Sequence, residues 1–127
     1  MTERVRSASP FEAQFGFCRA LRVADVIHVS GTAPIEPDGS NTAPGDAAAQ
    51  ARRCFQIIAE AVEALGGQLD HVVRTRMFLT HIEDWPEVGA VHGEVFGSIQ
   101  PVATMVEVSK LIDADWRVEI EAEAIVR

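Results

Sequence analysis

Apolar and polar residues alternate strictly over 118–124, close to the end of the chain. This period of two predicts a β-strand. One face of the strand is aliphatic, and the other carries three carboxylates, Glu119, Glu121 and Glu123. A face with three acids is either solvated or part of a polar interface or active site, and the pattern alone leaves both interpretations open.

Two segments have the spacing of an amphipathic helix instead. Over 47–65, apolar residues recur at intervals of three and four, Asp46 is placed to cap the start, and two glycines follow the end. Asp84 opens a second helix, in which valines line one side and Gly97 marks the end. The Pro- and Gly-rich residues of 34–45 predict a loop.

Further strands are expected over 21–31, 72–80 and 102–110. The order of strands, helix, strand, helix, strand, strand predicts an α+β fold with a mixed β-sheet and both helices on one face. The opposite sheet face would then be uncovered. Its charges are free to pair with each other, to meet another subunit, or to remain in water. The expected members of this face are His28, Ser30, Arg74, Arg76, Ala103, Met105, Glu107 and the three glutamates.

Size and composition narrow the possible functions. The chain has 127 residues, which suits one domain over 1–127, and its hydrophobic content of 47% allows an ordinary core. We expect no membrane span, because every apolar run is short, and a cytoplasmic location, because the charged N-terminus lacks a secretory segment. The net charge of −8 disfavours nucleic acid and anionic lipid as partners.

Cys18 and Cys54 are interpreted as apolar core residues, because no second cysteine or histidine stands at zinc spacing. A metal site built from His28 and the glutamates lacks a supporting motif. We therefore expect neither a metal nor another cofactor.

Several segments resemble the RidA family, also called YjgF or YER-type proteins. They include "VSGTAP" at 29–34, "PVATMVEVSKL" at 101–111 and "VEIEAEAIV" at 118–126. The resemblance implies a chorismate-mutase-like (YjgF) fold and a homotrimer whose sheets form a central barrel, with ligand clefts between subunits. It also implies hydrolysis of 2-imino acids or their enamine tautomers to 2-keto acids and ammonia, without a cofactor.

Residue by residue, the resemblance is partial. It places the water-positioning glutamate at Glu119 and the cleft serine at Ser30, beside the backbone N–H of Gly31. The cleft tyrosine of the family is Phe17 here, and the arginine that grips the substrate carboxylate is Ala103. Losing one half of such a buried pair costs roughly 2–5 kcal/mol. An ordinary 2-imino acid is therefore expected to be a poor substrate unless another cation binds it.

The candidates for that cation are Arg76, Arg74 and, close to Phe17, Arg19, although each arginine could instead pair with a glutamate. Our main prediction is a deaminase-like hydrolase for small imines or enamines that are neutral or held differently, with Phe17 and Met105 as an apolar wall. The alternative is a non-catalytic trimer that binds a small metabolite or a protein partner. RNA cleavage, a third possibility from the names of relatives, is disfavoured by the net charge.

Overall fold

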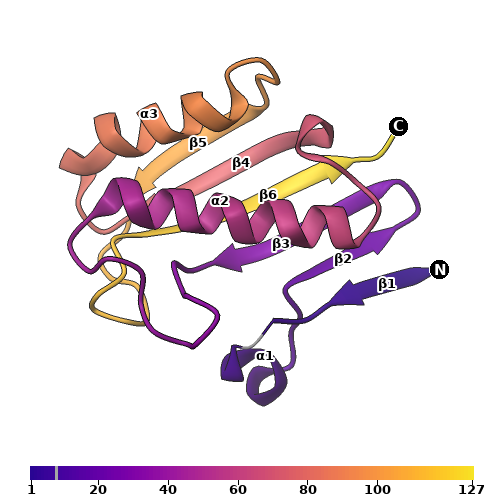
Figure 1. The fold of residues 1–127 in the computed structure, drawn as a ribbon, viewed down its shortest axis with the longest axis horizontal. Coiled ribbons are helices and arrows are strands. Elements are labelled where there is room, and N and C mark those ends of the chain that lie inside the picture. Colours follow the sequence, from indigo (N-terminus) through magenta and orange to yellow (C-terminus); the bar gives the residue numbers. More distant parts are fainter. Residues whose placement is uncertain (8) are drawn as a thin grey trace.

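The computed structural model describes residues 1–7 and 9–127. Within these residues, six strands form one mixed sheet in the order β1-β2-β3-β6-β4-β5, and only the β4–β5 pair is parallel (Figure 1). The elements in chain order are β1 (Thr2–Val5), α1 (Pro10–Phe15), β2 (Ala20–Val23), β3 (Val26–Thr32), α2 (Ala47–Ala64), η1 (Leu69–His71), β4 (Val72–Leu79), η2 (Ile82–Asp84), α3 (Trp85–Phe96), β5 (Val102–Glu107) and β6 (Val118–Ile125).

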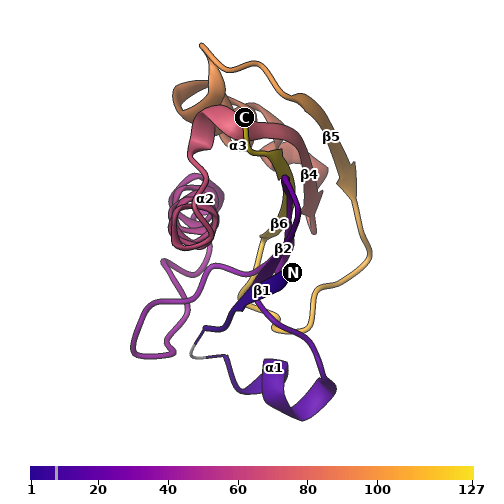
Figure 2. The same cartoon turned by 90° about the vertical axis from the view of Figure 1, so that its right-hand side faces the viewer.

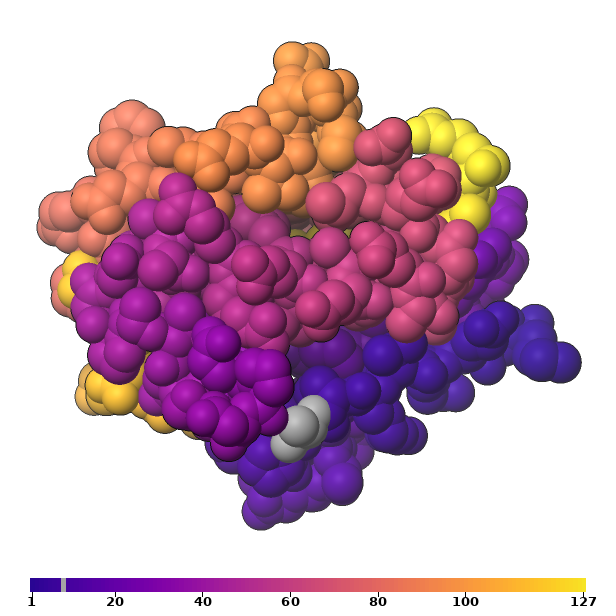
Figure 3. Space-filling view, in the orientation of Figure 1, coloured from indigo at the N-terminus to yellow at the C-terminus, as the bar shows by residue number. Residues whose placement is uncertain are grey.

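Helices α2 and α3 lie side by side over one face of the sheet, as predicted (Figures 1 and 3). Asp46 caps α2 by accepting a hydrogen bond from the Ala49 N–H at 3.0 Å. The apolar stripe of α2, including Phe55 and Ile58, is buried against the sheet. The expected α+β fold with a mixed sheet is confirmed. Within the described part of the chain, no helix has the length and apolar character needed to cross a membrane.

Asp84 precedes α3 as expected, but its side chain does not cap the helix. The carboxylate instead accepts hydrogen bonds from Arg117 Nε at 2.8 Å and Arg117 Nη2 at 3.1 Å. Asp84 therefore binds the Arg117 guanidinium and not the backbone N–H groups at the start of α3.

The alternation in β6 is confirmed. Val118 and Ile120 are fully buried under the helices, and the glutamates point to the other face. Across β4 and β6, Arg76 is paired in register with Glu121, and Arg74 with Glu123. The two strands therefore bring opposite charges together on the face that α2 and α3 leave uncovered.

The faces expected for the 102–110 strand are wrong. In the parallel β4–β5 register, Met105 stands beside Met77 and packs against the helix-covered core, and Ala103 stands beside Thr75. Val102 and Val106 lie on the uncovered face instead, with 57% and 40% of their surface exposed. The pattern misled because β5 is an edge strand, where alternating valines do not tell which face is buried.

The N-terminal segment has structure that the pattern did not predict. Strand β1 extends the sheet by pairing with β2, and the short helix α1 follows it below the sheet (Figure 2). Ser9 caps α1 by accepting from the Phe11 N–H at 3.4 Å, and Gly16 ends it with φ of 78°. This segment closes one side of the cavity described next.

Candidate functional site

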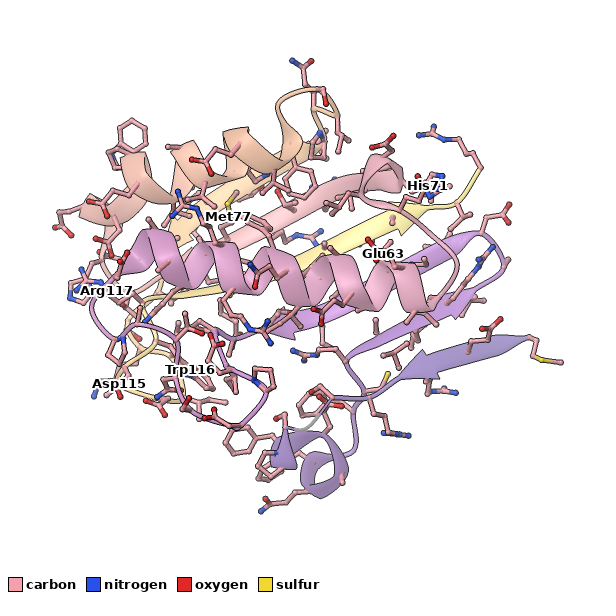
Figure 4. The ribbon with its side chains drawn as sticks, viewed as in Figure 1. Glu63, His71, Met77, Asp115, Trp116 and Arg117 are labelled. Carbon is pink, nitrogen blue, oxygen red and sulfur yellow. The ribbon has the colours of Figure 1, made fainter. Side chains whose placement is uncertain are left out.

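A cavity of about 710 Å³, here called the pocket, lies where α1, the end of β3, α2 and the loop before β6 meet. Four of the residues expected at the site line it together: Phe17, Ser30, Gly31 and Glu119. Figure 4 shows Trp116, another lining residue, at this end of the molecule. The large apolar side chains of the wall include Phe11, Phe15, Phe17, Ile57, Ile112 and Trp116.

An irregularity in β3 places Ser30 and Gly31 at the pocket. The β3–β6 register shifts between Val29 and Thr32, which is the mark of a β-bulge. The Ser30 hydroxyl donates to the Cys18 carbonyl at 2.7 Å, and its N–H donates to the Arg19 carbonyl at 2.9 Å. The serine proton is therefore engaged, and the hydroxyl oxygen remains available as an acceptor.

Gly31 provides the space that the Glu119 carboxylate occupies. A Cβ atom added at Gly31 would lie 2.8 Å from Glu119 Oε2 and 3.3 Å from Glu119 Cδ. Such contacts are closer than van der Waals distance, so any larger residue at this position would displace the carboxylate. The glycine of the "VSG" motif is thus explained by close side-chain approach, and the glycine's backbone N–H is not needed for this explanation.

The Glu119 carboxyl group is held in an environment that disfavours its charge. Burial raises the pKa of Glu119 above its usual value, Arg19 acts in the opposite direction, and Glu121 adds a smaller upward effect. A carboxyl group with a raised pKa is suited to exchanging protons near neutral pH.

Arg19 lies in the wall of the same pocket, and its side chain is only 9% exposed. Its Nη1 donates to Thr32 Oγ1 at 3.4 Å, but its buried Nε has no hydrogen-bond partner among the described residues. Burial lowers the pKa of the Arg19 guanidinium, while Glu12 and Glu119 raise it. A guanidinium remains charged in such a site, so the pocket contains an incompletely paired cation.

Glu12 reaches this cation from α1 and is 2% exposed. Its Oε2 lies 3.9 Å from Arg19 Nε, which is an ion pair but too long for a hydrogen bond. Its two oxygens accept instead from the Ser7 N–H, at 2.9 Å, and from the Ser7 hydroxyl. No feature of the sequence pointed to Glu12, because a single acid in a short unpredicted helix has no informative spacing.

The other expected site residues lie elsewhere in this chain. Ala103 and Met105 are on β5, at the opposite edge of the sheet, and Arg76 is on the uncovered face. Arg76 Nη1 donates to Glu121 Oε1 at 3.1 Å and to Glu123 Oε1 at 3.2 Å. Within the chain, Arg76 therefore pairs with glutamates, which was the alternative to its binding a substrate carboxylate.

We call this second cluster the charged face. Arg74 Nε lies 3.7 Å from Glu123 Oε1, and His28 Nδ1 lies 3.4 Å from Glu123 Oε2. The side chains are partly exposed, at 39% for Arg76 and 31% for Glu123. The members of the charged face are His28, Arg74, Arg76, Glu121 and Glu123.

Neither cluster has the arrangement of a metal centre. Over residues 1–7 and 9–127, no group of three or more histidine, cysteine, aspartate or glutamate residues could hold a metal ion. The Cys54 thiol is buried and donates to the Thr32 carbonyl at 3.2 Å, and burial raises its pKa far above the usual range. The thiolate, which is the nucleophilic form, is thereby disfavoured.

Comparison with known proteins assigns the chain to a family. The family model described as Endoribonuclease L-PSP matches residues 7–126. The chain belongs to this family, the YjgF/RidA family. A family structure from Mycobacterium tuberculosis, Rv2704, superposes with a TM-score of 0.90 at 41% identity, over 99% of this chain and 100% of that one.

Two curated relatives extend the comparison within the family. The Streptomyces coelicolor protein SCO2049 is 38% identical over 121 residues, which cover 95% of this chain and 90% of that protein. The 3-aminoacrylate deaminase RutC of Acinetobacter baylyi is 31% identical over 105 residues, covering 83% of this chain and 82% of that protein. The curated relatives of the chain thus include a protein that is named as a deaminase.

Proposed function

We propose that the chain is a hydrolytic deaminase for imine or enamine metabolites other than ordinary 2-imino acids. The observation that carries the proposal is the Glu119 carboxyl group, half-buried against Gly31 in a largely apolar pocket. The kinship with a protein named as a 3-aminoacrylate deaminase supports the reaction class. The overall reaction converts a C=N bond and water into a C=O bond and ammonia.

In this mechanism Glu119 orients a water molecule against the imine carbon and takes its proton as the C–O bond forms. This proton passes to nitrogen and gives a carbinolamine. Glu119 then takes the proton of the new hydroxyl group and transfers it to the nitrogen, which leaves as ammonia as the C=O bond forms and the C–N bond breaks. The Ser30 hydroxyl oxygen accepts a hydrogen bond from the substrate nitrogen, because its own proton is donated to Cys18. Phe17, which lacks the hydroxyl of the family tyrosine, contributes to the apolar wall.

We further propose a homotrimer in which the charged face meets its copies and each pocket lies at a subunit interface. The exposed Val102 and Val106 beside this face support burial by another chain. Ala103 and Met105, which are remote from the pocket in this chain, would reach a pocket only from a neighbouring copy. Sedimentation at micromolar concentration should give about three times the mass of 13.8 kDa, and a single-chain mass would contradict the assembly.

Ammonia release tests the reaction directly. 2-Aminoacrylate and several neutral imines are generated in situ, and ammonia is followed with the wild type, with Glu119→Gln and without protein. We expect the wild type to accelerate hydrolysis of the neutral imines more than that of 2-aminoacrylate. Glu119→Gln should lose about 100-fold or more of this activity, because proton transfer by a positioned group contributes at least this much. Hydrolysis that is unchanged in Glu119→Gln would remove the role assigned to this residue.

The second candidate function is a non-catalytic trimer that binds a small metabolite or a partner protein. The observation that favours it is the absence of the family's tyrosine hydroxyl and arginine at Phe17 and Ala103. Acceleration of none of the imines, together with binding of small molecules in the pocket, would establish this alternative over the deaminase.

A further inference from the structure

The pocket contains a cation whose hydrogen-bonding capacity is largely unused. A guanidinium has five N–H donors, and a buried donor without a partner is costly. Arg19 makes one long hydrogen bond, to Thr32 Oγ1 at 3.4 Å, and its Nε is unpartnered among residues 1–7 and 9–127. This side chain is more than nine-tenths buried in the wall of the pocket. Such an arrangement is suited to an anion that enters the pocket.

The acids beside Arg19 do not fill this role. Glu12 stays 3.9 Å from Arg19 Nε, because Ser7 supplies the hydrogen bonds that its two oxygens accept. Glu119 is near enough for the two charges to influence each other's pKa, but it makes no hydrogen bond to the guanidinium that the structure records within the described residues. Neither carboxylate therefore occupies the planar, bidentate position that an arginine offers.

Arg53 is the other arginine that lines the pocket, and its environment differs. Its Nε donates to the Ile35 carbonyl at 2.8 Å, and its Nη1 donates to Gln56 Oε1 at 3.4 Å. Arg53 thereby fixes the loop after β3 to α2. Of the two arginines, Arg19 is the one that has a buried, unpartnered guanidinium nitrogen within residues 1–7 and 9–127.

We propose that Arg19 binds the carboxylate of a substrate whose other end is a large apolar group. Hydrolysis of such a substrate rests on the proposed deaminase function. Binding of its carboxylate by Arg19 does not depend on that function. The carboxylate pairs with the buried guanidinium close to Glu119, and the apolar group packs against the wall formed by Phe11, Phe15, Ile57, Ile112 and Trp116. The imine acids that this chain accepts therefore have bulky apolar groups, and Arg19, which directly precedes β2, binds their carboxylates.

Binding of a matched acid and amide tests the proposal without requiring turnover. The probes are 3-phenylpropionate and the neutral 3-phenylpropionamide, which have the same apolar body and contain no imine. Titrations are followed by calorimetry and by the fluorescence of Trp116, which lies in the pocket wall. We expect the wild type to bind the acid roughly 30-fold more tightly than the amide, as a desolvated charge pair requires.

The variants separate Arg19 from its neighbours. Arg19→Met should lose the preference for the acid while still binding the amide, which shows at the same time that the pocket has folded. Arg19→Lys should retain part of the preference, because it keeps the charge but loses the planar fork. Arg52→Gln, on the exposed side of α2 and paired with Glu94, is the matched control and should bind both probes as the wild type does.

Equal binding of acid and amide by the wild type would overturn the proposal. So would an acid preference that survives in Arg19→Met, or one that Arg53→Gln abolishes and Arg19→Met does not. Failure of the deaminase hypothesis would look different: the acid would bind in an Arg19-dependent manner, but no imine would be hydrolysed. Conversely, imine hydrolysis with the same rate in Arg19→Met would retain the reaction and reject the role of Arg19.

Discussion

The pocket and the charged face use the same residue types, arginine and glutamate, in opposite ways. On the charged face, Arg76 contacts two glutamates at 3.1 and 3.2 Å, and the side chains remain partly in water. In the pocket, Arg19 is almost fully buried, its closest acid is 3.9 Å away, and its Nε is unpartnered within the described residues. The first cluster is internally satisfied, and the second leaves hydrogen-bonding capacity for something else.

The difference shows where the fold maintains an unfavourable arrangement. A buried charge without full compensation is destabilising, and proteins concentrate such groups at binding and catalytic sites. The charged face contains as many ionisable side chains as the pocket wall, but its electrostatics are those of ordinary surface pairs. The pocket is therefore the better candidate for chemistry.

The largest loss of stability is expected from substitution of Gln50 on α2. This side chain is fully buried, and both its amide nitrogen and its amide oxygen make hydrogen bonds. Its Nε2 donates to the Asp115 carbonyl at 2.8 Å, and its Oε1 accepts from the Arg117 N–H at 2.7 Å. Gln50→Leu should lower the free energy of unfolding by about 2–4 kcal/mol. Arg19→Met should lower it less, by about 1 kcal/mol, because an apolar residue replaces an ill-paired buried ion and Glu12, which loses the ion pair, keeps its hydrogen bonds from Ser7.

Chemical denaturation of the two variants measures this contrast. Equal losses in Gln50→Leu and Arg19→Met would mean that Arg19 is as structurally committed as Gln50. The distinction between satisfied and unsatisfied buried groups would then fail.

Gly31→Ala tests the close approach of the Glu119 carboxylate to the backbone of β3. The new methyl group would lie 2.8 Å from Glu119 Oε2 and push the carboxylate from its position. We expect turnover of the best imine substrate to fall by about 100-fold, as displacements of about 1 Å can do. Gly89→Ala on α3 is the matched control, because a methyl group there meets open space and leaves the pocket untouched. Equal activity of both variants would show that the position of Glu119 is unimportant.

The sequence predicted those parts of the molecule in which one face of an element is clearly apolar. The alternation in β6 and the stripe on α2 are of this kind, and both were confirmed. The sequence pattern predicted the wrong faces for β5. The alternating valines indicated that they face the core, but Met105 does so, because an edge strand has no fully buried face. Glu12 was unpredictable because its position depends on a tertiary contact between α1 and Arg19.

The stability of the protein should depend on the ionisation of Glu119 in the pocket. Burial raises the pKa of Glu119, so the folded state disfavours its ionised form. The contribution of Glu119 to the free energy of unfolding is therefore greatest below the ordinary glutamate pKa, where the side chain is protonated. This contribution is lost as the pH rises through the raised pKa of the folded state. Glu119→Gln should therefore melt at a higher temperature than the wild type at neutral pH, and the gain should vanish near pH 4, where both side chains are uncharged. A gain of the same size at every pH would point to packing instead of charge.

The smallest effect is expected on the charged face. Arg76 and Glu121 are paired at 3.1 Å but are 39% and 34% exposed, so water and salt compete with the interaction. A double-mutant cycle with Arg76→Gln and Glu121→Gln should give a coupling energy of about 0.2–1 kcal/mol in dilute, dissociated protein, decreasing with salt. A coupling energy above this range in the dissociated chain would show that Arg76 and Glu121 are not an ordinary solvent-screened surface pair. The contrast between the charged face and the pocket would then fail. A coupling that grows only as protein concentration rises would instead show that another copy covers the face, because removal of water strengthens the pair.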